Sequence, residues 1–237
     1  MRPQSVQIIS FSGIDGAGKS TQIDALLSLL ESQGQTSKLY TFWDDVVVLG
    51  PMRENLSFKV FKGDKGVGSP ERPISRRDKN VSSWYAVAFR LFLYALDALR
   101  LTMIVSRAYD RGRHVVIFDR YIYDELANLP LQYWIVRIYV RALLKVVPKP
   151  VLAFLVDADP EEAYRRKPEY PLEFVRRNRE AYLKMARLAK MTVLPPASVE
   201  TTASRIAGLF ASLDGRGDLK PAMSVAAPSE SVRSTSG

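Results

Sequence analysis

The chain has 237 residues, a formal net charge of +9 at pH 7, no cysteine and a single histidine. This length suits one sizeable α/β core, and the lack of cysteine excludes disulfides, thiolate metal sites and a cysteine nucleophile. The positive charge predicts an anionic partner, which could be a nucleic acid, a membrane surface or phosphorylated small molecules.

A glycine-rich run at residues 13–21 reads Gly-Ile-Asp-Gly-Ala-Gly-Lys-Ser-Thr. It follows a short β-branched, apolar segment at 6–12, expected to be a strand, and precedes an amphipathic stretch at 20–32, expected to be a helix. Strand, glycine turn and helix form the geometry in which the G-x-x-x-x-G-K-[ST] pattern binds a polyphosphate. The run therefore predicts a site for nucleotide phosphates. The alternative is a plain glycine-rich turn between strand and helix.

The residue types in this loop predict individual roles. Backbone N–H groups would surround the phosphates, Lys19 would reach the β- and γ-phosphates, and the Ser20 hydroxyl would ligate Mg²⁺. We expect Thr21 to cap the first helical turn. The full set expected at the donor phosphates is Gly13, Asp15, Gly16, Ala17, Gly18, Lys19, Ser20 and Thr21.

The rest of the chain alternates between apolar strands and helices. Further strands are expected at 38–42, 114–118, 151–156 and 192–194. Further helices are expected at about 82–110, 132–147, 160–166, 173–190 and 199–213. This alternation predicts the α/β class, with helices on both faces of a five-stranded, mainly parallel sheet, as in the three-layer P-loop NTPase fold.

Two segments interrupt this alternation. Residues 44–80 are basic and rich in glycine and proline, which predicts a mobile loop inserted into a domain that covers 1–213. Residues 214–237 are small and polar, which predicts a disordered tail.

Two apolar stretches are long enough to be candidate membrane segments. Residues 86–105 are interrupted by charged residues, and residues 131–147 carry a stripe of Arg137, Arg141 and Lys145. Neither is an uninterrupted span, and no secretory signal precedes the first strand, so we expect no membrane segment and a cytoplasmic protein. The stripe is expected to be the solvated side of a core or interface helix, and the alternative is contact with an anionic surface.

The third strand is followed by Asp119, Arg120 and Tyr121. In an open parallel sheet ligands bind beyond the carboxyl ends of the strands, so this segment should face the phosphate loop. Asp119 could hold Mg²⁺ directly or through water, and Arg120 could bind a phosphate through its planar fork. The alternative is a structural ion pair between Asp119 and Arg120 that closes the strand.

A second basic cluster, Arg165, Arg166 and Lys167, lies between a short helix and a proline-containing turn. Three cations at this place suit a lid over 160–172 that closes on transferring phosphates. They suit a solvated charged surface equally well, and the sequence favours neither.

Taken together, these segments resemble the thymidylate kinase family of nucleoside monophosphate kinases. The resemblance covers roughly residues 6–213 without 44–80. It rests on the segments 13–22, 116–121, 155–163, 172–182 and 196–200. It implies transfer of a phosphoryl group from ATP, with Mg²⁺, to dTMP or a related nucleotide, and it implies a homodimer.

The resemblance also implies roles for single residues. Gly16 follows Asp15, which looks like the subgroup in which the lid supplies the catalytic arginine. Arg165 or Arg166 would then stabilise the phosphoryl group in transfer. Arg120 would grip the acceptor phosphate, and Asp15 would reach the acceptor's sugar hydroxyl.

The sequence departs from the family pattern on the acceptor side. Phe42-Trp-Asp-Asp45 replaces a proline turn, and Tyr94 and Ala98 stand where the family has phenylalanine and a base-reading arginine. Asp124 stands where serine is common. The candidate acceptor residues are Asp15, Arg53, Tyr94, Arg120 and Asp124.

Two rival hypotheses stay open. The same core could act on another acceptor, with Trp43, Arg53 and the 44–80 loop forming a different pocket. Alternatively, the chain could be a nucleotide-binding or nucleic-acid-associated module without transfer activity. No nucleic-acid-binding motif is present, so nucleic acid is not expected as a partner.

Overall fold

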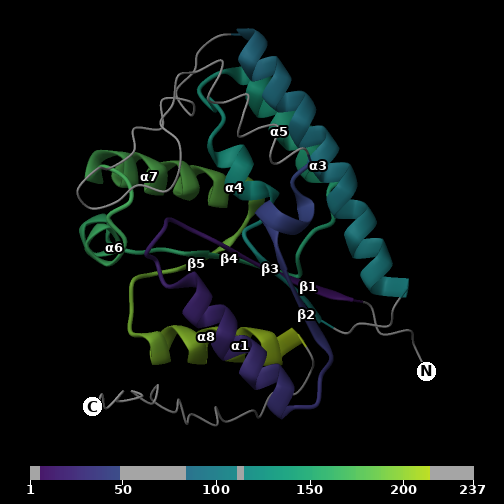
Figure 1. The fold of residues 1–237 in the computed structure, drawn as a ribbon, viewed down its shortest axis with the longest axis vertical. Coiled ribbons are helices and arrows are strands. Elements are labelled where there is room, and N and C mark those ends of the chain that lie inside the picture. Colours follow the sequence, from purple (N-terminus) through teal and green to yellow (C-terminus); the bar gives the residue numbers. More distant parts are fainter. Residues whose placement is uncertain (1–5, 49–83, 111–114, 214–237) are drawn as a thin grey trace, which may run out of the picture.

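The computed structural model describes residues 6–48, 84–110 and 115–213 (Figure 1). Arg53, the predicted tail at 214–237 and all but the first residues of the predicted loop at 44–80 lie outside the described residues.

The described residues form a five-stranded sheet with the strand order β2-β3-β1-β4-β5. The strands are β1 (Gln7–Ser12), β2 (Ser37–Thr41), β3 (Val115–Asp119), β4 (Leu152–Val156) and β5 (Thr192–Leu194). Every strand pair is parallel, which confirms the predicted α/β class and sheet. Strands β3 and β4 are apolar and almost completely buried, as expected for a parallel sheet covered on both faces.

Helices cover the two faces of the sheet, so the fold has three layers. Figure 1 shows α1 (Lys19–Ser32) and α8 (Val199–Leu213) side by side on one face. The other face carries α3 (Trp84–Asp110), α4 (Ile122–Ala127), α5 (Trp134–Val146) and α7 (Leu172–Ala189). The short helix α6 (Pro160–Arg166) lies at the edge of the sheet where the strands end.

The strand register brings three functional segments to one edge. Phe11 of β1 pairs with Asp119 of β3 on one side and with Phe154 of β4 on the other. The carboxyl ends of these three strands are therefore nearly level. As a result, the phosphate loop, Arg120 and the segment leading into α6 all leave the sheet at the same edge.

Two short elements differ from the predictions. Helix α4 was not predicted, because six residues that are all buried carry no helical alternation of polar and apolar positions. The predicted strand at 38–42 ends at Thr41 and is followed by a π-helical turn, η1 (Phe42–Val46), which includes the first three residues of the predicted loop at about 44–80. In this turn the Val47 amide donates to the Phe42 carbonyl at 3.0 Å, and the Asp45 carboxylate accepts from the Thr41 amide at 2.7 Å.

Helix α5 shows how the predicted cationic stripe is placed. Its buried side consists of Val136, Val140 and Leu143, whereas Arg137 and Arg141 are exposed. The stripe therefore lies on the exposed side of the helix, opposite the residues that pack on the core. Within the described ranges, no helix has the length and apolar character that crossing a membrane requires.

Candidate active site

The phosphate loop joins β1 to α1 and contacts helix α6. Gly16 has a φ of +82, and a Cβ atom at this position would lie 2.4 Å from the Ala163 carbonyl oxygen of α6. Only glycine allows this backbone-to-backbone approach. The loop and the start of the predicted lid are therefore in direct contact.

Helix α1 begins at Lys19, directly after Gly18, whose φ is +88. No side chain caps this end of the helix, so the prediction that Thr21 caps the first turn is wrong. The physical reason is that a capping side chain would occupy backbone N–H groups of the first turn. A phosphate loop keeps these groups for an anion, together with the positive end of the helix dipole.

The Lys19 side chain is buried under the loop. Its ammonium donates to the carbonyl oxygens of Gly13 at 3.0 Å and Ile14 at 2.9 Å. Burial lowers the pKa of Lys19 to about 8, and the charge of Arg120 acts in the same direction. The ammonium therefore lies against the backbone of the loop in which the motif is expected to hold a phosphate.

Arg120 faces the loop and forms ion pairs with two carboxylates. One terminal nitrogen, Nη2, pairs with Asp15, and the other, Nη1, lies 3.5 Å from a carboxylate oxygen of Asp124. Burial alone would lower the pKa of Arg120, but Tyr182 and these carboxylates raise it overall, so the guanidinium is permanently charged. The predicted approach of Arg120 to the phosphate loop is confirmed. Among the described residues, the ion pairs of Arg120 are with Asp15 and Asp124, and not with Asp119 as in the structural alternative.

Asp119 and Ser20 provide a donor set that fits Mg²⁺. One carboxylate oxygen of Asp119 is buried and has no hydrogen-bond partner among the described residues. The Ser20 side chain is exposed in the first turn of α1. Within the described ranges no three His, Cys, Asp or Glu residues form a metal cluster.

Helix α6, which begins the predicted lid, is stabilised by local sequence signals at its first turn. Asp159 accepts from the Glu162 amide at 3.0 Å and caps the helix, and Pro160 occupies its first position. Both Arg165 and Arg166 are exposed. The guanidinium of Arg166 lies 3.4 Å from the Gly16 carbonyl oxygen of the phosphate loop. Of these two arginines, the structure therefore brings Arg166 to the loop.

Ion pairs connect helix α7 to the carboxyl end of β4 and to α6. Arg179 binds Asp157 at the end of β4 through two contacts of 2.6 and 2.7 Å. Arg176 of the same helix binds Glu161 of α6 at 2.9 Å. These pairs connect α6 and α7 to each other and to the end of the central sheet.

The predicted acceptor residues have different surroundings. Tyr94 and Ala98 are buried in the packed face of α3. Asp124 is also buried, and its oxygens are bound by protein donors. Trp43 of η1 is 43% exposed beyond the end of β2.

Sequence reasoning missed two residues of the polar cluster that includes Arg120 and Asp124. The Tyr182 hydroxyl lies 3.2 Å from Nη1 of Arg120, and the Ser12 hydroxyl donates to Asp124 at 2.6 Å. Tyr182 lies on the buried side of an amphipathic helix, where an aromatic residue is usually part of the core. Only the three-dimensional fold reveals that its hydroxyl joins the polar cluster.

Comparison with known proteins gives the following matches. No family model matches the chain. A protein from Thermococcus kodakarensis named "Probable thymidylate kinase" is 30% identical over 223 residues, covering 87% of this chain and 98% of that protein. A Pyrococcus abyssi protein of the same name is 29% identical, covering 77% of this chain and 83% of that protein.

A solved structure has the same fold. The crystal structure of thymidylate kinase from Ehrlichia chaffeensis matches with a TM-score of 0.54 and 21% sequence identity. The match covers 88% of this chain and 99% of that one.

Proposed function

Because the chain belongs to the thymidylate kinase family and is thus a nucleoside monophosphate kinase, we propose that it transfers the γ-phosphoryl group of ATP to dTMP with Mg²⁺, in the cytoplasm. The observation that carries this proposal is the meeting of Arg120 and Asp15 beside the phosphate loop. This pair puts a phosphate-binding cation and a carboxylate that can accept from a sugar hydroxyl at one place. That place lies next to the loop that would hold the donor.

In this proposal the donor is bound by the loop amides and by Lys19, whose ammonium moves from the carbonyls of Gly13 and Ile14 to the β- and γ-phosphates. Ser20 and Asp119 would hold Mg²⁺, which neutralises charge on the phosphate oxygens when it is bound. No residue acts as a nucleophile, because positioning and electrostatic stabilisation account for most of the catalysis in such transfers.

The acceptor is bound on the opposite side of the transferred group. Arg120 binds the acceptor phosphate, and Asp15 accepts a hydrogen bond from the acceptor sugar. The lid arginine Arg166 then stabilises the negative charge that is spread over the phosphoryl group in the transition state. Its contact with the Gly16 carbonyl supports this role.

A panel of acceptors tests the proposal. With ATP and Mg²⁺ in a coupled assay for ADP, dTMP is expected to show the highest kcat/KM among dTMP, dUMP, UMP, CMP, AMP and GMP. Chelation of Mg²⁺ should stop the reaction. Turnover of no nucleoside monophosphate would refute the proposal.

A different acceptor is the second candidate. Ala98 is buried where a base-reading arginine would be expected, and Trp43 is exposed beyond the end of β2, where an aromatic ring could stack on a base. Preferred turnover of another nucleotide in the same panel would favour this candidate. A Trp43→Ala variant should then lose affinity for that nucleotide and retain its affinity for ATP.

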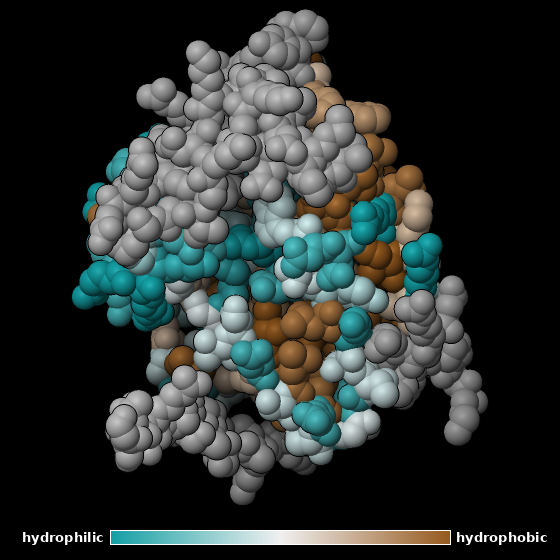
Figure 2. All heavy atoms as spheres, viewed as in Figure 1, coloured by the Kyte–Doolittle hydropathy of each residue, from teal (hydrophilic) through white to brown (hydrophobic). Residues whose placement is uncertain are grey.

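We further propose that the chain forms a homodimer through α3. Phe92, Leu99 and Met103 are 59%, 55% and 46% exposed and recur on one side of this helix. Figure 2 shows hydrophobic side chains gathered along α3 on the face in view. An exposed apolar stripe of this length is typical of a surface that another protein covers, and a second copy is the occupant we propose.

Replacing Leu99 with lysine in the middle of this stripe should produce a monomer in sedimentation velocity, because two ammonium groups would be buried at the interface. The matched control is Val199→Lys, a similar change at a residue that is 42% exposed on α8, on the opposite face of the sheet. This control should remain a dimer. A wild-type monomer, or a dimer that survives Leu99→Lys, would contradict the proposal.

A further inference from the structure

The guanidinium of Arg120 has two edges with different surroundings. Nη2 faces Asp15, whose side chain is 27% exposed. Nη1 faces inward, toward the Tyr182 hydroxyl at 3.2 Å and the Asp124 carboxylate at 3.5 Å. A ligand arriving from solvent can therefore compete for the first edge, while the second edge is covered by protein.

Asp124 is the centre of the inner cluster. Its side chain is 2% exposed, and both of its oxygens are bound. One oxygen accepts from the Ser12 hydroxyl at 2.6 Å and the Tyr121 amide at 3.0 Å. The other accepts from the Tyr182 hydroxyl at 2.8 Å and faces Arg120. A substrate could reach this carboxylate only by displacing these groups, so a direct contact with the acceptor is disfavoured.

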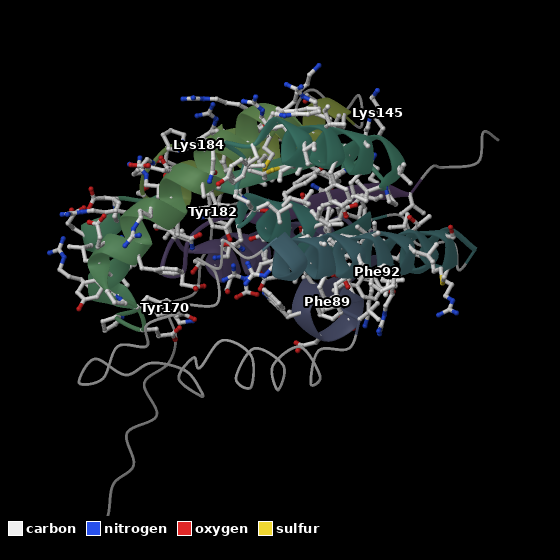
Figure 3. The ribbon with its side chains drawn as sticks, turned by 90° about the horizontal axis from the view of Figure 1, so that it is seen from above. Phe89, Phe92, Lys145, Tyr170, Tyr182 and Lys184 are labelled. Carbon is white, nitrogen blue, oxygen red and sulfur yellow. The ribbon has the colours of Figure 1, made fainter. Side chains whose placement is uncertain are left out.

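The position of Tyr182 is set by helix α7, on which it lies. Figure 3 shows Tyr182 on the inner side of this helix, while Lys184, two residues further, lies on its outer side. The pair between Arg179 and Asp157 fixes the same helix to the end of β4. The Tyr182 hydroxyl therefore meets Arg120 in a position set by the fold.

The backbone of Arg120 is constrained as well. Its φ is +67, a left-handed conformation that costs about 1–2 kcal/mol for a residue with a side chain. Its amide donates to the Phe11 carbonyl at 2.9 Å. A strained conformation of this kind persists where the surroundings determine it, and such residues are frequent at functional sites.

We propose that Asp124 and Tyr182 are positioning residues for Arg120, which hold its Nη1 edge so that its Nη2 edge faces the acceptor phosphate. This inference rests on the proposed function. It also replaces the sequence-based expectation that Asp124 contacts the acceptor directly.

In the proposed reaction Asp15 changes partner: it pairs with Arg120 in the structure and accepts from the sugar hydroxyl once the acceptor is bound. When Asp15 turns to the acceptor sugar, it no longer balances the charge of Arg120. Asp124 remains as a buried carboxylate next to Nη1, and Tyr182 binds both groups. The guanidinium therefore keeps its place while its partner at the outer edge changes from Asp15 to a phosphate.

Steady-state kinetics of Tyr182→Phe and Asp124→Asn test the inference. Tyr182→Phe removes one hydroxyl, and the KM for the acceptor should rise about tenfold, as expected for the loss of a hydrogen bond to charged groups. The KM for ATP should stay within about twofold. Asp124→Asn should raise the acceptor KM further, because it removes the buried counter-charge.

The matched control is Tyr139→Phe on α5. The Tyr139 hydroxyl also donates a hydrogen bond inside the protein, to the Leu91 carbonyl at 2.5 Å. This variant should lose stability as Tyr182→Phe does, but without a selective change in acceptor KM. An acceptor KM unchanged in Tyr182→Phe, or equal losses for acceptor and ATP, would overturn the inference.

A second measurement needs no turnover and separates this inference from the proposed function. Inorganic phosphate is titrated into the ¹⁵N-labelled protein, and the guanidinium signals of Arg120 are followed by NMR, with Arg120→Lys used for assignment. Phosphate should shift these signals in the wild type, and with several-fold weaker affinity in Tyr182→Phe. No response in the wild type, or equal affinity in both proteins, would refute the inference even if nucleotide turnover is confirmed.

Discussion

Replacing Lys19 with methionine is expected to lower kcat by about a hundred- to a thousandfold, the effect of removing one preorganised donor from a site of charge development. Methionine fills the space of the lysine stem but cannot bind the β- and γ-phosphates. The coupled ADP assay measures the loss. The control is Lys184→Met, a loss of charge at an exposed position of α7, which should leave kcat unchanged. A Lys19→Met variant with wild-type kcat would exclude the proposed donor site.

Lys19 should also affect how the stability of the protein depends on pH. Burial is the largest cause that lowers the pKa of Lys19 from 10.5 to about 8. Below pH 8 the folded and unfolded chains both hold the proton, so the folded chain bears the full cost of a buried ammonium. Between about pH 8 and pH 10.5 the unfolded chain binds more protons, and the stability of the wild type rises with pH.

Methionine does not titrate, so the Lys19→Met variant serves as the reference for the pH dependence of the wild type. The free energy of unfolding of the wild type relative to Lys19→Met should rise by about 3 kcal/mol between pH 7 and pH 10.5. Urea unfolding at the two pH values measures this difference. A difference that does not change with pH would show that Lys19 is not buried as an ammonium.

Replacing Arg166 with alanine is expected to lower kcat by about 10³- to 10⁵-fold, the range for loss of an arginine that stabilises a transferring phosphoryl group. The matched control is the neighbouring Arg165→Ala, which should lower kcat by less than about tenfold. The distinction rests on the contact of Arg166, and not of Arg165, with the Gly16 carbonyl. Single-turnover and steady-state rates should both show this difference between the two variants.

The free energy of unfolding should fall by no more than about 0.5 kcal/mol in Arg166→Ala. The ion pair that this variant loses, with Glu162 at 3.3 Å, is exposed, and exposed i,i+4 pairs contribute only about 0.3–0.5 kcal/mol. A thermal unfolding curve that matches the wild type would therefore assign the kinetic loss to chemistry. Equal kinetic losses in the two arginine variants, or a larger loss in Arg165→Ala, would contradict the assignment.

The sequence was sufficient to predict the features that depend on residues close together in the chain. The order of strand, glycine loop and helix, and the residues directly after β3, follow from local patterns, so the fold and the meeting of Arg120 with the loop could be predicted. The contact between Tyr182 and Asp124 joins residues 58 positions apart and depends on how α7 packs on α4. No local pattern distinguishes such a tyrosine from an ordinary core residue.

Two other differences between the predictions and the structure also have physical causes. Helix α4 is too short and too buried to show an amphipathic period, and its start is stabilised by Asp124, a residue that looked like a candidate for substrate contact. The prediction for Thr21 applied the rule for ordinary helices, which cap their first turn with a side chain. A phosphate loop departs from that rule because its free N–H groups bind the ligand.

The contact between Gly16 and the Ala163 carbonyl limits how this enzyme could be redesigned or could diverge. Any side chain at position 16 would displace α6, since its Cβ would lie 2.4 Å from that oxygen. An arginine introduced there would move Arg166 away from the loop at the same time. A side chain at position 16 and the present position of α6 thus exclude each other, so the loop and α6 would have to change together.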